Sequence, residues 1–437
     1  MAQAPGGLTS RKLGEQERLF HYLHGFGGLI AIQVLHIVGP VDPDLLREAL
    51  DWLQSQHPIL NSHIEYGWPV FRHLPPFVYR QPYFVTEGTE PIPLRVVTNP
   101  APDAWKREFE RELGRPLARG RSPRLRAVLV RASEGADACQ IFLTADHAIA
   151  DARSTNMASR DLLAFLADKA KVAVRQGAQL SLSPELETRL PKQRDAGKSC
   201  TRIKGVPARK RGGRWRTGLA EYHFDADKAA AIKLAIRAER TTVHGAVSAA
   251  FLGAFRERYG RDELSLISSV DLRRLCKPPF GPEIFGCYID LVRTSHTIAG
   301  ELWANARDIS LRLVAALAKG RESASLMKLP GGAFYRHDAL SAVLNKRRID
   351  ALAVTTAGES GLARDYGRLR LEGVTMAVST VMFGTALFVI CSERLGGLDL
   401  YAGYSEDALE PAEAEWLTQR AASLLLAATA AQASPAA

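Results

Sequence analysis

The sequence has little cysteine and no pattern that would pair its cysteines. Five are scattered along the 437 residues without a C-x-x-C pair: Cys139, Cys200, Cys276, Cys287 and Cys391. An odd, scattered set argues against a disulfide framework and against a zinc module, so we interpret the thiols as reduced and mostly structural. The sequence establishes no neighbouring His or cationic setting for Cys276 or Cys287, and we expect both to be inert.

Long apolar runs are also missing. No stretch approaches the roughly 18 to 20 apolar residues that a membrane-spanning helix needs. The first seven residues, MAQAPGG, lack the basic and then apolar organisation of a signal peptide. The sequence therefore favours a cytoplasmic protein without stable membrane insertion.

Nucleotide-binding motifs are absent. The chain contains neither a G-x-G-x-x-G after an apolar strand nor a G-x-x-x-x-G-K-[S/T] loop. Its expected strands and helices do not alternate strictly, as they do in doubly wound nucleotide-binding sheets. Nucleotide hydrolysis and hydride transfer therefore have no support.

Positive charge is in excess, with a formal net charge of +10, and this predicts attraction to an anionic partner. Much of it lies in one stretch rich in Gly and basic residues, which include Lys192, Arg194, Lys198, Arg202, Lys204, Arg209, Lys210, Arg211, Arg214 and Arg216. We interpret residues 191–218 as a basic flexible linker. Aromatic residues are nearly absent from it, which argues against nucleic-acid binding.

Hydrophobic periodicity predicts strands and helices mixed through both halves of the chain. Strands are expected at residues 30–38, 93–97, 125–130, 139–144, 220–224 and 264–270, and helices at 14–23, 42–56, 153–170, 225–239, 241–259 and 300–319. Near the end, strands at 374–381, 387–392 and 398–404 are expected in one sheet, before a helix over 411–428. The pattern predicts an α/β (α+β) fold of mixed sheets with helices, with an N-terminal lobe over residues 1–190 and a C-terminal lobe over 219–437.

The segment from Ile141 to Ala152 carries the clearest chemistry. An apolar strand runs into His147, and a carboxylate follows four residues later at Asp151. Imidazole titrates near neutrality, so His147 is suited to take a proton from an alcohol or amine. The pair alone is a weak signal and needs its context. His244 is a second candidate base, but its expected place at a helix start facing the core favours a structural role.

Four segments in fixed order supply that context: Arg11 to Leu19 with Glu17, the helix ending in Gln56-His57-Pro58-Ile59-Leu60, the His147/Asp151 pair, and Ser269-Val270-Asp271-Leu272-Arg273-Arg274. Together they resemble the superfamily of thioester-dependent acyltransferases that includes chloramphenicol acetyltransferase, condensation domains of non-ribosomal peptide synthetases and free-standing polyketide-associated acyltransferases. The resemblance spans nearly the whole chain and is closest to the free-standing members. It implies two similar lobes with an active-site tunnel between them.

The resemblance also implies roles for individual residues. His147 matches the second His of an H-H-x-x-x-D-G motif and would be the general base. Asp151 matches the motif Asp, which would pair with Arg273 of the Asp271-Leu272-Arg273 segment. Two positions depart from the motif, since Asp146 stands in place of the first His and Ala152 in place of Gly. Asp146 would support the site, most simply through a hydrogen bond to backbone at the turn.

The implied reaction moves an acyl group from a coenzyme A or phosphopantetheinyl acyl-carrier-protein thioester to an alcohol or amine, in lipid or secondary-metabolite assembly. Ser379 or Thr380 would help to stabilise the oxyanion, and Arg209, Lys210 and Arg211 would help to dock the donor. No metal or bound cofactor is expected, and the protein is expected to be a monomer. The alternatives are a free-standing condensation domain that joins two carrier-bound substrates and a non-catalytic condensation-like binding module.

Overall fold

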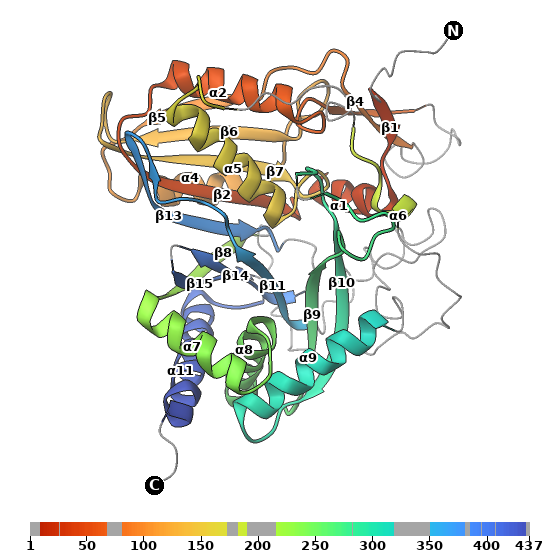
Figure 1. Ribbon diagram of the computed structural model, residues 1–437, viewed down its shortest axis with the longest axis vertical. Coiled ribbons are helices and arrows are strands. Elements are labelled where there is room, and N and C mark those ends of the chain that lie inside the picture. The colour runs from red at the N-terminus through yellow and green to blue at the C-terminus, as the bar shows by residue number, and fades with distance from the viewer. Residues whose placement is uncertain are drawn as a thin grey trace. The chain divides into compact units, whose positions relative to one another are not determined.

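The computed structural model describes residues 9–25, 27–67, 81–172, 182–189, 216–281, 283–318, 350–380, 385–394, 396–406 and 408–433. Two compact units make up the chain, each combining sheets with helices (Figure 1). Unit 1 comprises Met1–Leu190, Arg273–Tyr288 and Gly361–Val378, and unit 2 comprises Pro191–Leu272, Ile289–Ser360 and Ser379–Ala437. The units therefore interleave along the chain, in contrast to the contiguous lobes expected from the sequence.

The main sheet of unit 1 has six strands. Their order is β12 (Asp365–Tyr366), β13 (Leu369–Val378), β2 (Ile30–Val38), β7 (Ala138–Asp146), β6 (Leu125–Arg131) and β5 (Leu94–Thr98). Neighbours run antiparallel, except that β5 and β6 are parallel. A smaller sheet in the same unit has the order β1 (Ser10–Lys12), β4 (Pro82–Val85) and β3 (His63–Tyr66).

Strand β13 corrects one expectation. The sequence placed its apolar residues in one sheet with the two strands that follow, because all three runs look alike. Instead, β13 pairs with β2 of unit 1 along residues 370–378, while the next two strands belong to unit 2. A strand buried among others needs only apolar residues and a partner, so its own pattern does not say which sheet it joins.

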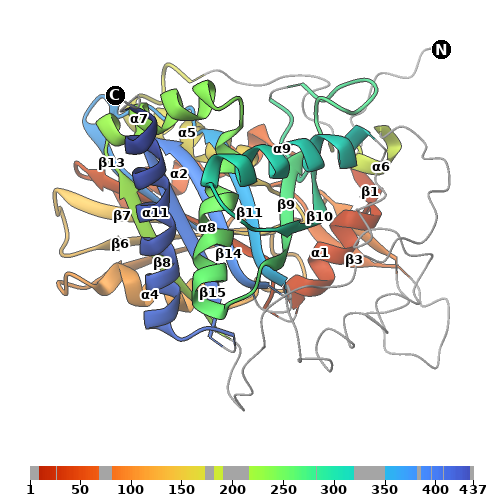
Figure 2. The ribbon, with the colours of Figure 1, turned by 90° about the horizontal axis from the view of Figure 1, so that it is seen from below.

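Helices cover both faces of the main sheet of unit 1. The helices of unit 1 are α1 (Glu15–Gly25), α2 (Pro43–Gln56), α4 (Ala104–Leu113), α5 (Ala152–Ala167) and the short α6 (Leu186–Arg189). Figures 1 and 2 show α2 and α5 together on one face and α4 on the other. The start of α2 follows the expected signals, since the Asp42 carboxylate accepts a hydrogen bond from the Asp44 N–H and Pro43 takes the first helical position.

Unit 2 is built on a second six-stranded sheet. Its order is β10 (Ile289–Thr297), β9 (Glu263–Asp271), β11 (Asp350–Glu359), β14 (Thr385–Arg394), β15 (Gly397–Ser405) and β8 (Thr217–Phe224). Its helices are α7 (Ala226–Ala238), α8 (Val243–Tyr259), α9 (Leu302–Ala318) and α11 (Pro411–Ala433), which cover one face of the sheet (Figure 2). The expected linker lies mostly outside the described residues, including Arg209, Lys210 and Arg211, and residues 217 and 218 already belong to β8.

Helix α8 is the centre of unit 2. Thr242 caps its start by accepting the Gly245 N–H, and Gly260 ends it in a left-handed conformation with φ of 60°. Most residues from Gly245 to Phe255 are buried, so the helix is apolar around its whole circumference. Such a helix is stable only when neighbours enclose it, and here α9, α11 and the sheet do so.

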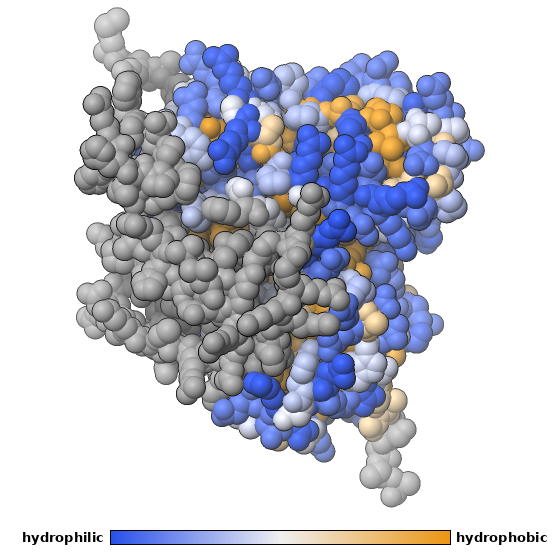
Figure 3. Space-filling model, turned by 180° about the vertical axis from the view of Figure 1, so that it is seen from behind, coloured by the Kyte–Doolittle hydropathy of each residue, from blue (hydrophilic) through white to orange (hydrophobic). Residues whose placement is uncertain are grey.

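The described surface is mainly polar. Figure 3 shows hydrophilic residues over most of the described part of one face, with hydrophobic ones in limited patches. The most exposed large apolar side chains are Leu311 and Val314 on α9 and Leu234 on α7. Within the described part of the chain, no helix is both long and apolar enough to cross a membrane.

Two glycines of α8 give a test of this packing. A Cβ at Gly245 would lie 2.5 Å from the Ala306 carbonyl oxygen and against the Ser310 hydroxyl, both on α9, whereas a Cβ at Gly253 would meet only the flexible end of Leu424. We expect Gly245→Ala to lower the free energy of unfolding by about 1 to 3 kcal/mol, as overpacking does. Gly253→Ala should be neutral, or stabilising by up to about 1 kcal/mol through helix propensity. Urea unfolding of both variants measures the difference, and equal losses would contradict the close crossing of α8 and α9.

Candidate active site

His147 lies in the turn directly after β7. Its backbone N–H donates to the Leu29 carbonyl at 3.2 Å, next to the start of β2, so the turn is fixed to the main sheet of unit 1. The Phe20 ring of α1 meets the imidazole edge-on, with ring centroids 5.4 Å apart. The side chain is buried, and burial lowers its pKa from the ordinary value of 6.5. Burial therefore favours the neutral imidazole, which is the form that can accept a proton.

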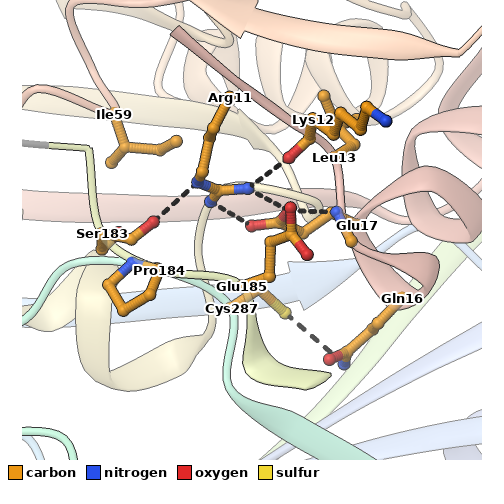
Figure 4. Close-up of polar contacts among 12 residues, drawn as sticks. Arg11, Lys12, Leu13, Gln16, Glu17, Ile59, Ser183, Pro184, Glu185 and Cys287 are labelled. Atoms are coloured by element: carbon orange, nitrogen blue, oxygen red, sulfur yellow. Dashed lines mark hydrogen bonds and ion pairs between the residues drawn. The ribbon is translucent and has the colours of Figure 1, made fainter. Parts of the chain in front are cut away.

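Cys287 contacts His147, which the sequence did not foresee. Its Sγ lies 3.5 Å from the His147 Nδ1, although 140 residues separate the two in the chain. The Gln16 Nε2 approaches the same sulfur at 4.0 Å (Figure 4). The sequence could not establish this neighbour, because the contact arises only when the 273–288 segment packs within unit 1. Cys276 of the same segment is a buried thiol.

Asp151 is the N-cap of α5 and makes the ion pair expected with Arg273. The Arg273 Nη1 lies 2.6 Å from Oδ2 and its Nη2 lies 3.1 Å from Oδ1, which is a bidentate contact. The Ser154 N–H donates to Oδ1 and the Tyr288 N–H to Oδ2, both at 3.0 Å. Burial alone would raise the Asp151 pKa, but the Arg273 charge and these hydrogen bonds hold it below its ordinary value. All of its acceptor capacity serves the structure, so Asp151 is not poised to react.

The Arg273 guanidinium extends this network. Its Nη2 also donates to the Ser154 hydroxyl and to the Gly286 carbonyl, each at 3.1 Å. The Gly286 N–H in turn donates to the Ser154 hydroxyl at 3.0 Å. The start of α5 is thereby fastened to residues 286–288, which brings Cys287 to His147.

Asp146 is fully buried and belongs to a different network. Its Oδ1 accepts the Ala148 N–H at 3.0 Å, which is the backbone contact expected at the turn. Its Oδ2 accepts from the Arg124 Nε and Nη2 at 3.3 and 3.2 Å and from the His21 Nδ1 at 2.7 Å. Burial opposes ionisation, yet the neighbouring His24, His21 and Arg124 hold the Asp146 pKa well below its ordinary value. Since Arg124 is buried too, a His in place of Asp146 would leave it without an anion.

A third buried ion pair fixes α1, as Figure 4 shows. Arg11 binds Glu17 through two contacts of 2.6 Å, and its Nε donates to the Ser183 carbonyl at 2.6 Å. The Glu17 carboxylate also accepts the Gly14 N–H at 2.8 Å, at the start of the helix. Glu17 thus holds the helix that presents Gln16 to Cys287 and Phe20 to His147.

The remaining expected residues lie in unit 2. Asp271 is exposed at the end of β9. Ser379 and Thr380 are buried beside Thr217, whose Oγ1 lies 3.4 and 3.2 Å from their hydroxyl oxygens. The His244 Nε2 lies 2.8 Å from the buried Ser268 hydroxyl. The tunnel and the oxyanion role of Ser379 and Thr380 stay predictions. Among the described residues, no group of three or more His, Cys, Asp or Glu side chains could hold a metal ion.

The two mixed αβ units, with His147 in the turn after β7, define a protein with the fold of chloramphenicol-acetyltransferase-like acyltransferases and condensation domains. The fold that the resemblance implies is thereby confirmed. A family model described as the C-terminus of phthiocerol/phthiodiolone dimycocerosyl transferase matches residues 216–354. No curated protein sequence is similar enough to match.

Solved structures resemble the chain over nearly its full length. Polyketide synthase associated protein 5 from Mycobacterium tuberculosis is 18% identical with a TM-score of 0.66, over 98% of this chain and 100% of that one. A trichothecene 15-O-acetyltransferase from Fusarium sporotrichioides is 12% identical with a TM-score of 0.71, over 98% and 100%. The first condensation domain of the calcium-dependent antibiotic synthetase is 15% identical with a TM-score of 0.70, over 98% of both chains. At such identities the likeness establishes the fold.

Removing either partner of the Asp151–Arg273 pair would leave a buried charge alone. We expect Asp151→Ala and Arg273→Met each to lower the free energy of unfolding by about 3 to 5 kcal/mol. The double variant should lose less stability than the two single variants together, since neither charge is left buried without its partner. Urea unfolding provides the measurement, with Glu48→Gln as the control, because the Glu48–Lys169 pair is exposed and should contribute less than about 1 kcal/mol. An Asp151→Ala variant as stable as the control would refute this role.

Stability should fall in mild acid because of His24. This residue is buried, its Nε2 accepts the Leu117 N–H at 2.9 Å, and burial lowers its pKa from 6.5 to about 4. Between these values the unfolded chain binds the proton and the folded chain does not, so stability decreases with falling pH by up to about 1.4 kcal/mol per unit. His244, also lowered to about 4, acts in the same direction. Urea unfolding from pH 7 to 5 should show a shallower slope for His24→Gln.

His223 provides the control of opposite sign. Its hydrogen bond to Asp399 raises its pKa above 6.5, so its stabilisation is complete below the unfolded value and is lost as the pH rises through the folded one. His223→Gln should therefore leave the slope below about pH 6 unchanged. A His24→Gln slope equal to that of wild type would show that His24 is not the group responsible.

Proposed function

We propose that this protein is an acyltransferase that moves an acyl group from a coenzyme A or acyl-carrier-protein thioester to an alcohol or amine, with His147 as the general base. The observation that carries the proposal is the buried His147 imidazole in the turn after β7, whose Nδ1 lies against Cys287. The setting of polyketide or other secondary metabolism is suggested by the matched family model and by the names of the similar proteins.

A thioester carbonyl is already activated, so such an enzyme has mainly to align the acceptor and to take its proton. In this proposal His147 removes the proton as the acceptor attacks, and the C–S bond then breaks. His147 returns the proton to the departing thiolate, so no acyl-enzyme is needed at this site. Since Nδ1 lies against Cys287, Nε2 is the nitrogen that would face the acceptor. Ser379 and Thr380 are candidates to stabilise the oxyanion.

A free-standing condensation domain that joins two carrier-bound substrates is the second candidate. Its support is the similarity to a condensation domain, with a TM-score of 0.70. A non-catalytic binding module has less support. Its support is that Asp146 and Ala152 replace the first His and the Gly of the motif, whereas Arg124 gives Asp146 a structural reason for being there.

Thiol release from a panel of acyl-coenzyme A thioesters, with simple alcohols and amines as acceptors, tests the proposal. We expect His147→Ala to slow release by about 10²-fold or more, as the loss of a general base does. His244→Ala is the matched control. It also removes a buried imidazole, but one that lies in unit 2, and it should leave the rate of thiol release unchanged. Release that needs acyl-carrier-protein thioesters would favour the condensation alternative. The acyltransferase proposal would be contradicted if His147→Ala left thiol release unchanged. It would also be contradicted if neither acyl-coenzyme A nor acyl-carrier-protein thioesters gave any release.

A further inference from the structure

Tyr66, His21 and Asp146 form a hydrogen-bonded series in unit 1. The Tyr66 hydroxyl lies 2.9 Å from the His21 Nε2, and the His21 Nδ1 lies 2.7 Å from the Asp146 Oδ2. Exposure increases along the series: Asp146 is 0% exposed, the His21 side chain 12% and Tyr66 38%. A buried carboxylate, a mostly buried imidazole and a partly exposed tyrosine therefore follow one another.

The proton positions follow from the chemistry of the partners. An ionised carboxylate only accepts hydrogen bonds, so the His21 Nδ1 donates to Asp146, and the form of His21 that can act as a base carries its one proton there. Its Nε2 is then an acceptor, and the Tyr66 O–H donates to it. Two contacts from Arg124 fix the Asp146 carboxylate, so the tautomer is held by buried groups. This order of hydroxyl, imidazole and carboxylate activates a hydroxyl as a nucleophile in unrelated enzymes.

The series is separate from the His147 contacts. On α1, Phe20 touches His147, whereas the next residue, His21, binds Asp146 and Tyr66. At the end of β7, Asp146 and His147 are likewise adjacent, yet their side chains have different partners. His147 takes no part in the hydrogen-bonded series of Tyr66, His21 and Asp146, so the His21 and His147 imidazoles can be tested independently.

We propose that Tyr66 is a covalent acylation site that accepts acyl groups from activated esters and thioesters, with His21 as its base. The Tyr66 oxygen attacks the carbonyl carbon while its proton passes to the His21 Nε2. The C–S bond of the thioester breaks, and the departing thiolate takes the proton from Nε2. The products are an acyl-Tyr66 ester and a free thiol, so no oxidant or further reactant is needed. Partial burial raises the Tyr66 pKa, so reaction near neutral pH depends on His21 rather than on free phenolate.

The full-length protein, incubated near neutral pH with acetyl-coenzyme A or with 4-nitrophenyl acetate, tests this site. Intact mass and peptide mapping should find one acetyl group on Tyr66. Tyr66→Phe should abolish the label. His21→Gln, whose amide can still donate to Asp146 and so keep the fold, should slow labelling by about 10²-fold or more. Asp146 variants are avoided because they would leave the buried Arg124 guanidinium without its carboxylate partner.

The controls separate this site from the proposed transferase chemistry. His147→Ala should lose transfer to added acceptors but keep the Tyr66 label. Tyr83, on the neighbouring strand β4, is the internal reference for unspecific acylation and should stay unlabelled. An unmodified Tyr66 in the wild-type protein, labelling of Tyr83 to the same extent, or an unchanged rate in His21→Gln would each overturn the proposal.

Discussion

The arrangement of unit 1 around His147 depends on the buried ion pair between Asp151 and Arg273. The carboxylate caps α5 and at the same time binds a guanidinium more than a hundred residues away in the chain. Each group is nearly inaccessible to solvent, so each requires the other. Their contact fastens the 273–288 segment to α5, and that segment supplies the Cys287 that lies against His147. The surroundings of the candidate base are thus assembled by a charge pair that takes no part in the proposed reaction.

Two further buried pairs around the same site serve other elements. Arg11 with Glu17 fixes the start of α1, and Arg124 with Asp146 fixes the end of β7. A buried ion pair adds little net stability, because desolvation offsets most of the attraction. Its directional contacts instead select one arrangement of the backbone. We infer that these three pairs mainly set geometry, while the apolar residues of the sheets and helices supply most of the stability.

The sequence could predict local structure where a pattern is complete within a few residues. The strand over Ile30–Val38 and the helix after Asp42 are confirmed, because alternation and a capping Asp beside Pro43 are local signals. The fold was predicted from four segments that, in their order along the chain, resemble the motifs of a superfamily. The partner sheet of β13 and the contact between Cys287 and His147 were missed, because both depend on pairings over long separations. The hydrogen-bonded series of Tyr66, His21 and Asp146 was missed for the same reason, since its members lie far apart in the sequence.

The replacement of the first motif His by Asp146 gains a physical explanation from these contacts. Asp146 is the last residue of β7 and His147 the first of the turn, and their side chains meet different partners although the two residues are adjacent. Asp146 binds Arg124 and His21, whereas His147 lies against Phe20 and Cys287. A change of the first motif His to Asp146 therefore alters the contacts with Arg124 and His21. It leaves the contacts of His147, the candidate base, unchanged. For that reason the departure from the motif carries little weight against catalysis, and the buried Arg124 is sufficient reason for a carboxylate at this position.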